Sequence, residues 1–207
     1  MAQNKPMSNH RSTNVPAIIL AAGASTRLGQ PKQLLRLPQF SGETLLDRAI
    51  RLAQQAGADP VFVVLGAHAE EIQCNAQLPD CTVLLNPDWP EGMASSLRTG
   101  IRAVMEQLPQ APAALLMVCD QPALTAEHLR QLLASHDAEP EIIVASWYAN
   151  RSGVPVVVPS TMFPALLELR GDQGARAILK QDAMRVKEVA FPDGTWDIDS
   201  PEDLRRL

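Results

Sequence analysis

The sequence predicts an α/β fold, a three-layer α/β/α sandwich built around a mostly parallel sheet. Two observations predict it. Short apolar runs alternate with longer amphipathic stretches from residue 15 onward, and each apolar run is bounded by Gly, Pro or polar residues, as strands and helices are. Strands that alternate with helices form βαβ units, whose crossovers make the sheet parallel and cover both of its faces.

Six apolar runs have the length and the boundaries of strands, over residues 17–21, 61–65, 82–85, 115–118, 142–146 and 154–158. In an open sheet of this kind, ligands bind at the carboxyl ends of the strands. The residues that directly follow each run are therefore candidates for a site.

Helical patterns lie between these runs. After Thr44, apolar residues have the spacing of a helix with one buried face, and Gly57 ends the pattern. Similar patterns predict helices over residues 95–107, 125–135, 164–167 and 174–181. A last helix over residues 201–207 has Ser200 as its N-cap, with acids in its first turn and arginines in its last, as the helix dipole favours.

Length and composition limit the class of protein. The chain has 207 residues, 46% of them hydrophobic, which is enough for one domain with a core that needs no disulfide or metal. Residues 1–14 are polar and lack periodicity. We therefore expect a disordered tail there and a single domain over residues 15–207.

No segment is long and apolar enough to suggest a membrane protein. The longest apolar run, residues 113–119, is far shorter than the roughly 18 residues of a membrane span. The N-terminus lacks the apolar core of a signal peptide. We expect a soluble, cytoplasmic protein without a membrane partner. The three cysteines are expected to be reduced, because their number is odd and no C-x-x-C spacing occurs.

Charge is unevenly distributed along the chain. The formal net charge is −5, yet residues 1–55 carry seven Lys or Arg against two acids. A basic N-terminal part suits an anionic ligand. The acidic remainder of the chain, with few aromatic residues, argues against a nucleic-acid surface. A small phosphorylated ligand fits better.

The segment after the first predicted strand has the composition of a phosphate-binding loop. Small residues at positions 21–25 let the backbone approach a ligand closely, and Arg27 and Lys32 add positive charge. The pattern is neither G-x-G-x-x-G nor the Walker motif, because the lysine comes well after Gly23 and does not open a helix. The alternative is a Gly/Ala turn with two solvated basic residues.

Aspartates supply candidate metal ligands. Asp120 follows a strand that we expect to be central and buried, and Mg²⁺ prefers oxygen ligands, with one or two carboxylates completed by nucleotide phosphates. If residues 196–199 form a short strand, Asp197 and Asp199 point to the same face. The alternatives are that Asp120 caps the next turn and that Asp199 caps the last helix.

Two further loops lead into predicted helices, and neither is specific alone. Residues 86–98 place Ser95 and Ser96 for capping or for ligand contacts, and residues 171–176 form a tight turn that suits an anion or close packing. The four histidines have no partner spacing, and no serine lies in G-x-S-x-G. Covalent hydrolysis is therefore unsupported.

Together these segments resemble the MobA-like nucleotidyltransferases, and most closely the molybdenum-cofactor cytidylyltransferase branch. The resemblance covers residues 15–207. It rests on six motifs in family order: Leu20-Ala21-Ala22-Gly23 with Arg27 and Pro31-Lys32, Asn86-Pro87 with Gly92-Met93 and Ser96-Leu97, Asp120-Gln121-Pro122, Ser152-Gly153-Val154-Pro155, Gly171-Asp172 with Gly174-Ala175-Arg176, and Asp197-Ile198-Asp199-Ser200-Pro201-Glu202-Asp203.

The resemblance implies a nucleotidyltransferase fold of the glycosyltransferase-A type and a role for each matching residue. It implies that Arg27 and Lys32 hold the triphosphate as catalytic groups and that Asp120 binds Mg²⁺ with Asp197 or Asp199. Acceptor contacts would come from Gly153 and Arg176. Nucleotide contacts would come from Leu20, Ala21, Ala22, Gly23, Lys32, Asn86 and Ser96.

The implied activity is transfer of CMP from CTP to the phosphate of molybdopterin with release of pyrophosphate. CTP is favoured over GTP because Ala21-Ala22-Gly23 is similar to the cytidylyl branch, whereas the guanylyl branch usually has Ala-Gly-Gly. The product would serve a molybdenum hydroxylase or its maturation chaperone. Three alternatives stay open: another NTP, another phosphorylated acceptor such as a sugar phosphate or phospholactate, and a non-catalytic molybdenum-cofactor insertion chaperone.

Overall fold

A seven-stranded sheet in the order β3-β2-β1-β4-β6-β5-β7 organises the computed structural model, which describes residues 15–181 and 185–205. The predicted tail, residues 1–14, lies outside the described residues. The strands are β1 (Ala17–Leu20), β2 (Val61–Leu65), β3 (Thr82–Leu85), β4 (Ala113–Val118), β5 (Ile143–Tyr148), β6 (Arg151–Pro159) and β7 (Val186–Ala190).

Six strands run in the same direction and one is reversed. β1 pairs in parallel with β2 and β4, β2 with β3, and β5 with β7, whereas β6 is antiparallel to both of its neighbours. The predicted mostly parallel sheet is thus confirmed. Because β6 is reversed, its first residues lie at the same edge as the carboxyl ends of the parallel strands, and this edge carries the site.

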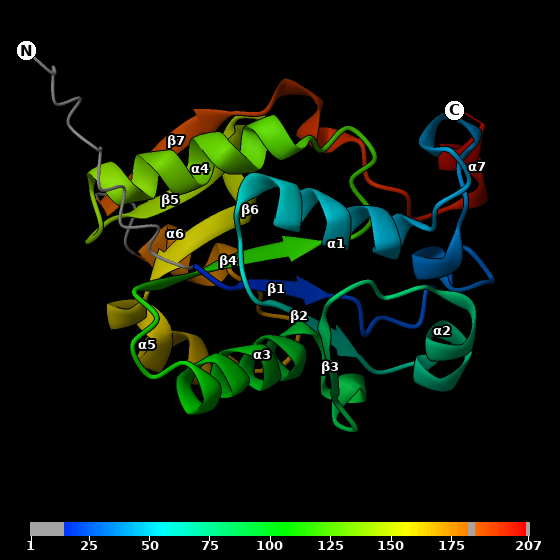
Figure 1. The fold of residues 1–207 in the computed structure, drawn as a ribbon, viewed down its shortest axis with the longest axis horizontal. Helices are drawn as coiled ribbons and strands as arrows, with labels where there is room; N and C mark the ends of the chain where they lie inside the picture. The colour runs from blue at the N-terminus through cyan, green and yellow to red at the C-terminus, as the bar shows by residue number, and fades with distance from the viewer. Residues whose placement is uncertain (1–14, 182–184, 206–207) are drawn as a thin grey trace, which may run out of the picture.

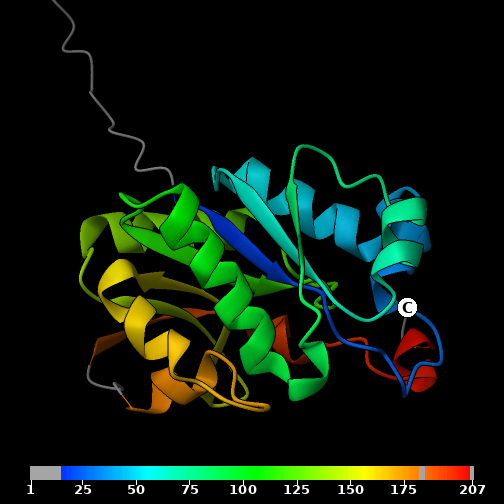
Figure 2. The same ribbon diagram turned by 90° about the horizontal axis from the view of Figure 1, so that it is seen from below.

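Helices cover both faces of the sheet (Figures 1 and 2). On one face, α1 (Leu45–Ala56) packs beside α4 (Ala126–Ala138). On the other face, α3 (Met93–Gln107) packs beside α5 (Phe163–Leu167), and α6 (Arg176–Gln181) contacts β6. The expected three-layer α/β/α sandwich is confirmed.

Alternation along the strands builds one core on each face. In β1 the side chain of Ile19 joins the core under α1 and α4, and that of Ile18 joins the core under α3 and α5. Both side chains are fully buried. Successive strand residues point to opposite faces, so a strand covered on both sides must be apolar throughout. This is why the central strands β1, β2 and β4 were visible in the sequence as unbroken apolar runs.

Local signals fix several element ends. Thr44 accepts a hydrogen bond from the backbone amide of Asp47 at 3.0 Å and caps α1, and Gly57 ends the helix with a φ of 95°. α7 (Pro201–Leu204) begins after Ser200 in a capping box with Asp203. A small cluster of Leu37, Leu45, Ile198 and Leu204 packs the C-terminal segment against the loop that follows β1.

Three features differ from the sequence-based expectations. β7 and α2 (Ala69–Asn75) were not predicted, because the five residues of β7 include two adjacent charged residues, Lys187 and Glu188, and α2 buries only Ile72. Residues 196–199 form no strand. Instead, the backbone amide of Ile198 donates to the carbonyl oxygen of Asp120 at 3.0 Å, which places the C-terminal aspartates beside the end of β4.

Among the described residues, no helix combines the length and the apolar character that a membrane crossing requires.

Candidate active site

Two adjoining pockets open at the carboxyl edge of the sheet. The first, which we call the loop pocket, has a volume of about 390 Å³, and the loop after β1 forms one of its walls together with Lys32, Trp89 and Ser96. The second, the aspartate pocket, has a volume of about 420 Å³ and is lined by Arg176, Asp197 and Asp199 among others. Lys32 and Asp120 line both pockets, so the two form one continuous site.

The loop after β1 is held in place by a buried glutamine. The side-chain amide of Gln33 donates to the carbonyl oxygens of Ala21 at 2.7 Å and Gly23 at 3.1 Å. The backbone amide of Lys32 donates to the Ser25 hydroxyl at 3.2 Å. A Cβ added to Gly23 would meet no atom within 4 Å. The loop therefore faces open space that a bound group can enter.

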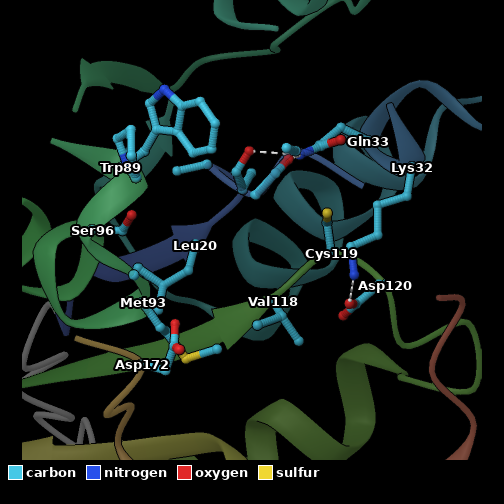
Figure 3. Close-up of a pocket in the computed structure, with 16 residues that line it drawn as sticks. Leu20, Lys32, Gln33, Trp89, Met93, Ser96, Val118, Cys119, Asp120 and Asp172 are labelled. Atoms are coloured by element: carbon cyan, nitrogen blue, oxygen red, sulfur yellow. Dashed lines mark hydrogen bonds and ion pairs between the residues drawn. The ribbon is translucent and has the colours of Figure 1, made fainter. Parts of the chain in front are cut away.

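A cluster of opposite charges lies next to this loop (Figure 3). The Lys32 ammonium donates to a carboxylate oxygen of Asp120 and, at 2.8 Å, to one of Asp199. Arg27 donates to the other Asp199 oxygen at 2.9 Å. Burial lowers the pKa of Lys32, but the carboxylates raise it by more, so the pKa of Lys32 stands above its ordinary value and the lysine is cationic.

The third aspartate differs from its neighbours. Burial, together with the charges of Asp120 and Asp199, raises the pKa of Asp197 to about 6. For Asp199, burial also raises the pKa, but Lys32 and Arg27 outweigh it and the net shift is downward. Oδ1 of Asp197 and Oδ1 of Asp120 are buried and accept no hydrogen bond within the described residues.

These orphaned oxygens suit a hard divalent cation. No group of three or more His, Cys, Asp or Glu side chains in the described part of the chain forms a complete metal cage. Mg²⁺ needs only one or two carboxylates when phosphate oxygens and water complete its shell. The Asp120 and Asp197 carboxylates, each with a buried oxygen unpartnered in the described chain and both lining the aspartate pocket, fit that requirement.

Asn86 has a different position from the one expected of a ligand contact. It is 3% exposed and does not line either pocket. Its side-chain amide donates to the hydroxyls of Ser95 at 2.9 Å and Ser96 at 3.0 Å. Ser96 lines the loop pocket. Asn86 therefore orients Ser96 from behind the pocket wall.

The segment at 171–172 is joined to the start of α3. Arg98 donates to the Glu91 carboxylate at 2.9 Å and to the carbonyl oxygen of Leu169 at 2.7 Å. The backbone amide of Ala94 donates to the carbonyl of Gly171 at 2.9 Å. This approach needs the missing side chain of Gly92, since a Cβ there would lie 2.6 Å from the Asp172 carboxylate. Asp172 consequently lines both pockets.

Tyr148 and Arg176 line the aspartate pocket and contact each other. Arg176 donates to the Tyr148 hydroxyl at 3.3 Å, and the same hydroxyl donates to the carbonyl of Val154 at 3.1 Å. Gly153 does not line the pocket. A Cβ on Gly153 would lie 2.7 Å from the Tyr148 ring carbon that bears the hydroxyl, so the glycine makes room for Tyr148.

The structure thus brings most of the predicted site residues to one edge of the sheet. Asn86 and Gly153 lie behind the walls and act on neighbours that line the pockets. Sequence reasoning missed Gln33, Trp89, Tyr148 and Asp172 as site residues. Trp89 and Asp172 lie inside motifs already singled out, so their motif position was the available signal. Tyr148 and Gln33 carried no signal of their own.

Comparison with known proteins adds independent evidence. The family model described as MobA-like NTP transferase domain matches residues 17–187. The nicotine blue oxidoreductase of Paenarthrobacter nicotinovorans is 33% identical over 93% of this chain and 96% of the relative. The molybdenum cofactor cytidylyltransferase of Escherichia coli is 27% identical over 92% of this chain and 93% of the relative.

Solved structures agree with this picture. The homologue of Mycobacterium tuberculosis Rv0371c from Mycobacterium sp. strain JC1 has a TM-score of 0.80 at 33% identity, covering 94% of this chain and 95% of that chain. The complex of Mycobacterium tuberculosis Rv0371c with manganese has a TM-score of 0.76 at 31% identity, covering 94% and 97%.

Proposed function

This chain belongs to the MobA-like NTP transferase family, and from that premise we propose that it transfers CMP from CTP to the phosphate of molybdopterin and releases pyrophosphate. The observation that carries the proposal is the Lys32 ammonium between Asp120 and Asp199, at the point where the loop after β1 opens into a pocket. Cations and carboxylates meet there beside the open loop pocket.

The chain's own groups align the reactants. A phosphate oxygen of the acceptor attacks the α-phosphorus, the new O–P bond forms, and the bond to the bridging oxygen breaks as pyrophosphate leaves. Lys32 and Arg27 hold the leaving phosphates and offset their charge, and such alignment and neutralisation are most of what phosphoryl transfer needs. The acceptor phosphate is ionised near pH 7, so no side chain has to remove a proton.

Asp120 would hold Mg²⁺ together with Asp197 or Asp199, whose oxygens are the orphaned or ion-paired acceptors of the site. When bound, the ion supplies charge neutralisation at the phosphate oxygens. The complex of Mycobacterium tuberculosis Rv0371c with manganese supports a divalent cation in this family. Asp199 also forms an ion pair with Arg27 at 2.9 Å. The Asp199 carboxylate therefore positions a phosphate-binding cation in addition to Lys32.

The acceptor side is the aspartate pocket. Arg176 lines this pocket and would bind the acceptor's anionic group. The cytidylyltransferase of Escherichia coli supports molybdopterin as the acceptor. The product would then be delivered, by this chain or by a maturation chaperone, to a molybdenum hydroxylase.

The test is pyrophosphate release with Mg²⁺, comparing CTP, GTP, ATP and UTP, with molybdopterin or its molybdenum form as acceptor. We expect release with CTP in preference to the other nucleotides. Lys32→Ala should lower the rate by about 10²–10³, the usual loss for one charge-stabilising donor. Lys187→Ala is the matched control, because Lys187 is an exposed lysine that pairs only with Glu139 among the described contacts.

Each failure has a distinct meaning. Preference for GTP would assign the chain to guanylyl transfer. Nucleotide binding without release would favour another phosphorylated acceptor, such as a sugar phosphate or phospholactate. Tight molybdopterin binding with no release from any NTP would favour a non-catalytic insertion chaperone and refute the proposal.

A further inference from the structure

Trp89 is the one aromatic side chain among the described residues that line the loop pocket. It begins the short 3-10 helix Trp89–Glu91 that precedes α3, and it is only partly buried. Figure 3 shows Trp89 and Ser96 at one end of the pocket and Lys32 with Asp120 at the other. The pocket is therefore aromatic at one end and charged at the other.

A glycine and a backbone hydrogen bond place Trp89 at this end of the pocket. Gly66 follows β2, and a Cβ added there would lie 2.7 Å from the Trp89 Cγ and 2.9 Å from the Ala22 Cβ. The missing side chain of Gly66 thus lets Trp89 reach the loop that follows β1. Behind it, the backbone amide of Gly92 donates to the carbonyl oxygen of Trp89 at 3.1 Å. This hydrogen bond fixes the Trp89 backbone, and the close approach of Gly66 lies at the base of the side chain.

We propose that the Trp89 indole is the plane on which the nucleobase of the bound NTP stacks. The proposal rests on the proposed function, because it requires a nucleotide whose phosphates lie at Lys32. A nucleotide with its phosphates at the charged end must extend its base toward the other end of the pocket. Every base has a π-face, so stacking gives affinity without choosing between bases. Discrimination is left to polar groups such as the Ser96 hydroxyl.

Two measurements test the proposal. In a Trp147→Phe, Trp196→Phe double variant, Trp89 is the only tryptophan of the chain, and its fluorescence reports on contact with a base. We expect saturable quenching by CTP and none by inorganic tripolyphosphate. Calorimetric titration of the otherwise unchanged protein then compares Trp89→Leu with Trp89→Phe, both in the presence of Mg²⁺.

The expected result is a loss of CTP affinity on the order of tenfold or more in Trp89→Leu, from the usual cost of losing one stacked base. Trp89→Phe should retain most of the affinity because it keeps an aromatic face. Affinity for tripolyphosphate should be equal in all three proteins.

Other results overturn the inference. If Trp89→Leu binds CTP as tightly as the wild type, Trp89 does not stack and nucleotide binding stands without it. If Trp89→Leu loses CTP and tripolyphosphate affinity equally, the side chain only supports the loop. If the wild type binds tripolyphosphate at least as tightly as it binds every NTP, both the stacking role and the proposed function fail.

Discussion

Lys32 forms ion pairs with two carboxylates, and these pairs give the residue a structural role before any ligand binds. Its side chain is 19% exposed and ion-paired to Asp120 and Asp199. A partly buried pair is weak evidence for net stabilisation, but removing one partner leaves uncompensated charge and is costly. Lys32 therefore supports the folded state of the site as well as the proposed reaction. From the sequence alone it would be taken for a loop lysine with little to lose.

Lys32→Met should lower the free energy of unfolding by about 1–3 kcal/mol without divalent cations. Added Mn²⁺ should raise the melting temperature of the variant more than that of the wild type, because the carboxylates are then free to bind the ion. Thermal denaturation with and without Mn²⁺ measures both effects. Lys187→Met serves as the control, and an equal Mn²⁺ shift in variant and wild type would contradict the expectation.

Asp197 and Asp199 should separate in their effects on stability. At pH 8 the Asp197 carboxylate is ionised, although burial and the charges of Asp120 and Asp199 raise its pKa to about 6. The pKa of Asp197 is higher in the folded than in the unfolded chain. Protonation of Asp197 therefore favours the folded state at low pH, and this contribution to stability is lost as the pH rises through 6. Asp197→Asn should therefore raise the free energy of unfolding at pH 8 by about 1–2 kcal/mol and change little at pH 4.5.

Asp199→Asn should instead lower the free energy of unfolding at pH 8. Lys32 and Arg27 outweigh burial and lower the pKa of Asp199, so its stabilising contribution is present at pH 8 and declines as the pH falls. Urea unfolding of both variants at the two pH values gives the comparison. The same sign for both variants at pH 8 would show that the two carboxylates are equivalent.

At the scale of elements, α4 is joined to the sheet through a buried histidine. Nε2 of His128 lies 2.8 Å from the Ser146 hydroxyl on β5, and that hydroxyl donates to the carbonyl of Pro155 on β6 at 2.7 Å. The hydroxyl proton is thus used, so His128 donates to Ser146 as a neutral ring. The ring also stacks on Phe191 at 4.5 Å between centroids. One side chain therefore connects a helix with two strands and the segment after β7.

Burial lowers the pKa of His128, which gives a prediction for pH. Below the unfolded pKa of about 6.5 the unfolded chain binds more protons than the folded chain, so stability falls as the pH falls. We expect His128→Gln, which keeps a side-chain donor for Ser146, to weaken this dependence between pH 7.5 and 5.5. One titrating proton changes the free energy of unfolding by at most about 1.4 kcal/mol per pH unit, so the slope of the variant should be smaller than that of the wild type by no more than this. An unchanged slope in urea unfolding would assign the dependence elsewhere, for example to His136.

At the scale of the whole molecule, the sheet continues without a break from β3 to β7. Two cores lie on its faces, and strand residues from both ends of the described chain take part in them. The antiparallel strand β6 joins the β1–β4 part of the sheet to the β5 and β7 edge. If the two parts were separated, each would expose a strand edge and residues of the core.

Residues 15–207 should consequently unfold as one cooperative unit, and we propose that they form a single domain. Urea unfolding followed by circular dichroism and by tryptophan fluorescence should give coincident curves, as two-state behaviour requires. Trp89 and Trp147 lie toward opposite sides of β6 in the strand order. Two separated transitions would show that the sheet is divided into independently folding parts.

Much of the fold could be read from the sequence because strand and helix patterns are local. β2 and β3 end where the apolar runs end, and α1 lies between the predicted Thr44 and Gly57. Full burial on both faces makes a parallel strand uniformly apolar, and a one-sided helix shows its period. β7 and α2 lack these signals, and they were missed because local patterns were the only basis for prediction. The reversed direction of β6 also leaves no trace in a pattern of burial.

Local patterns in the sequence predict six of the seven strands, most of the helices, the small-residue loop with Lys32, and the residues that follow those strands. How those residues combine into a site depends on tertiary packing. Asp199 rather than Asp197 contacts Lys32, Asn86 is buried behind Ser96, and Trp89 reaches the loop across Gly66. Periodicity is a property of neighbouring residues, whereas ion pairs and pocket walls depend on segments far apart in the chain. Their arrangement is set by strand order and packing, which no local pattern encodes.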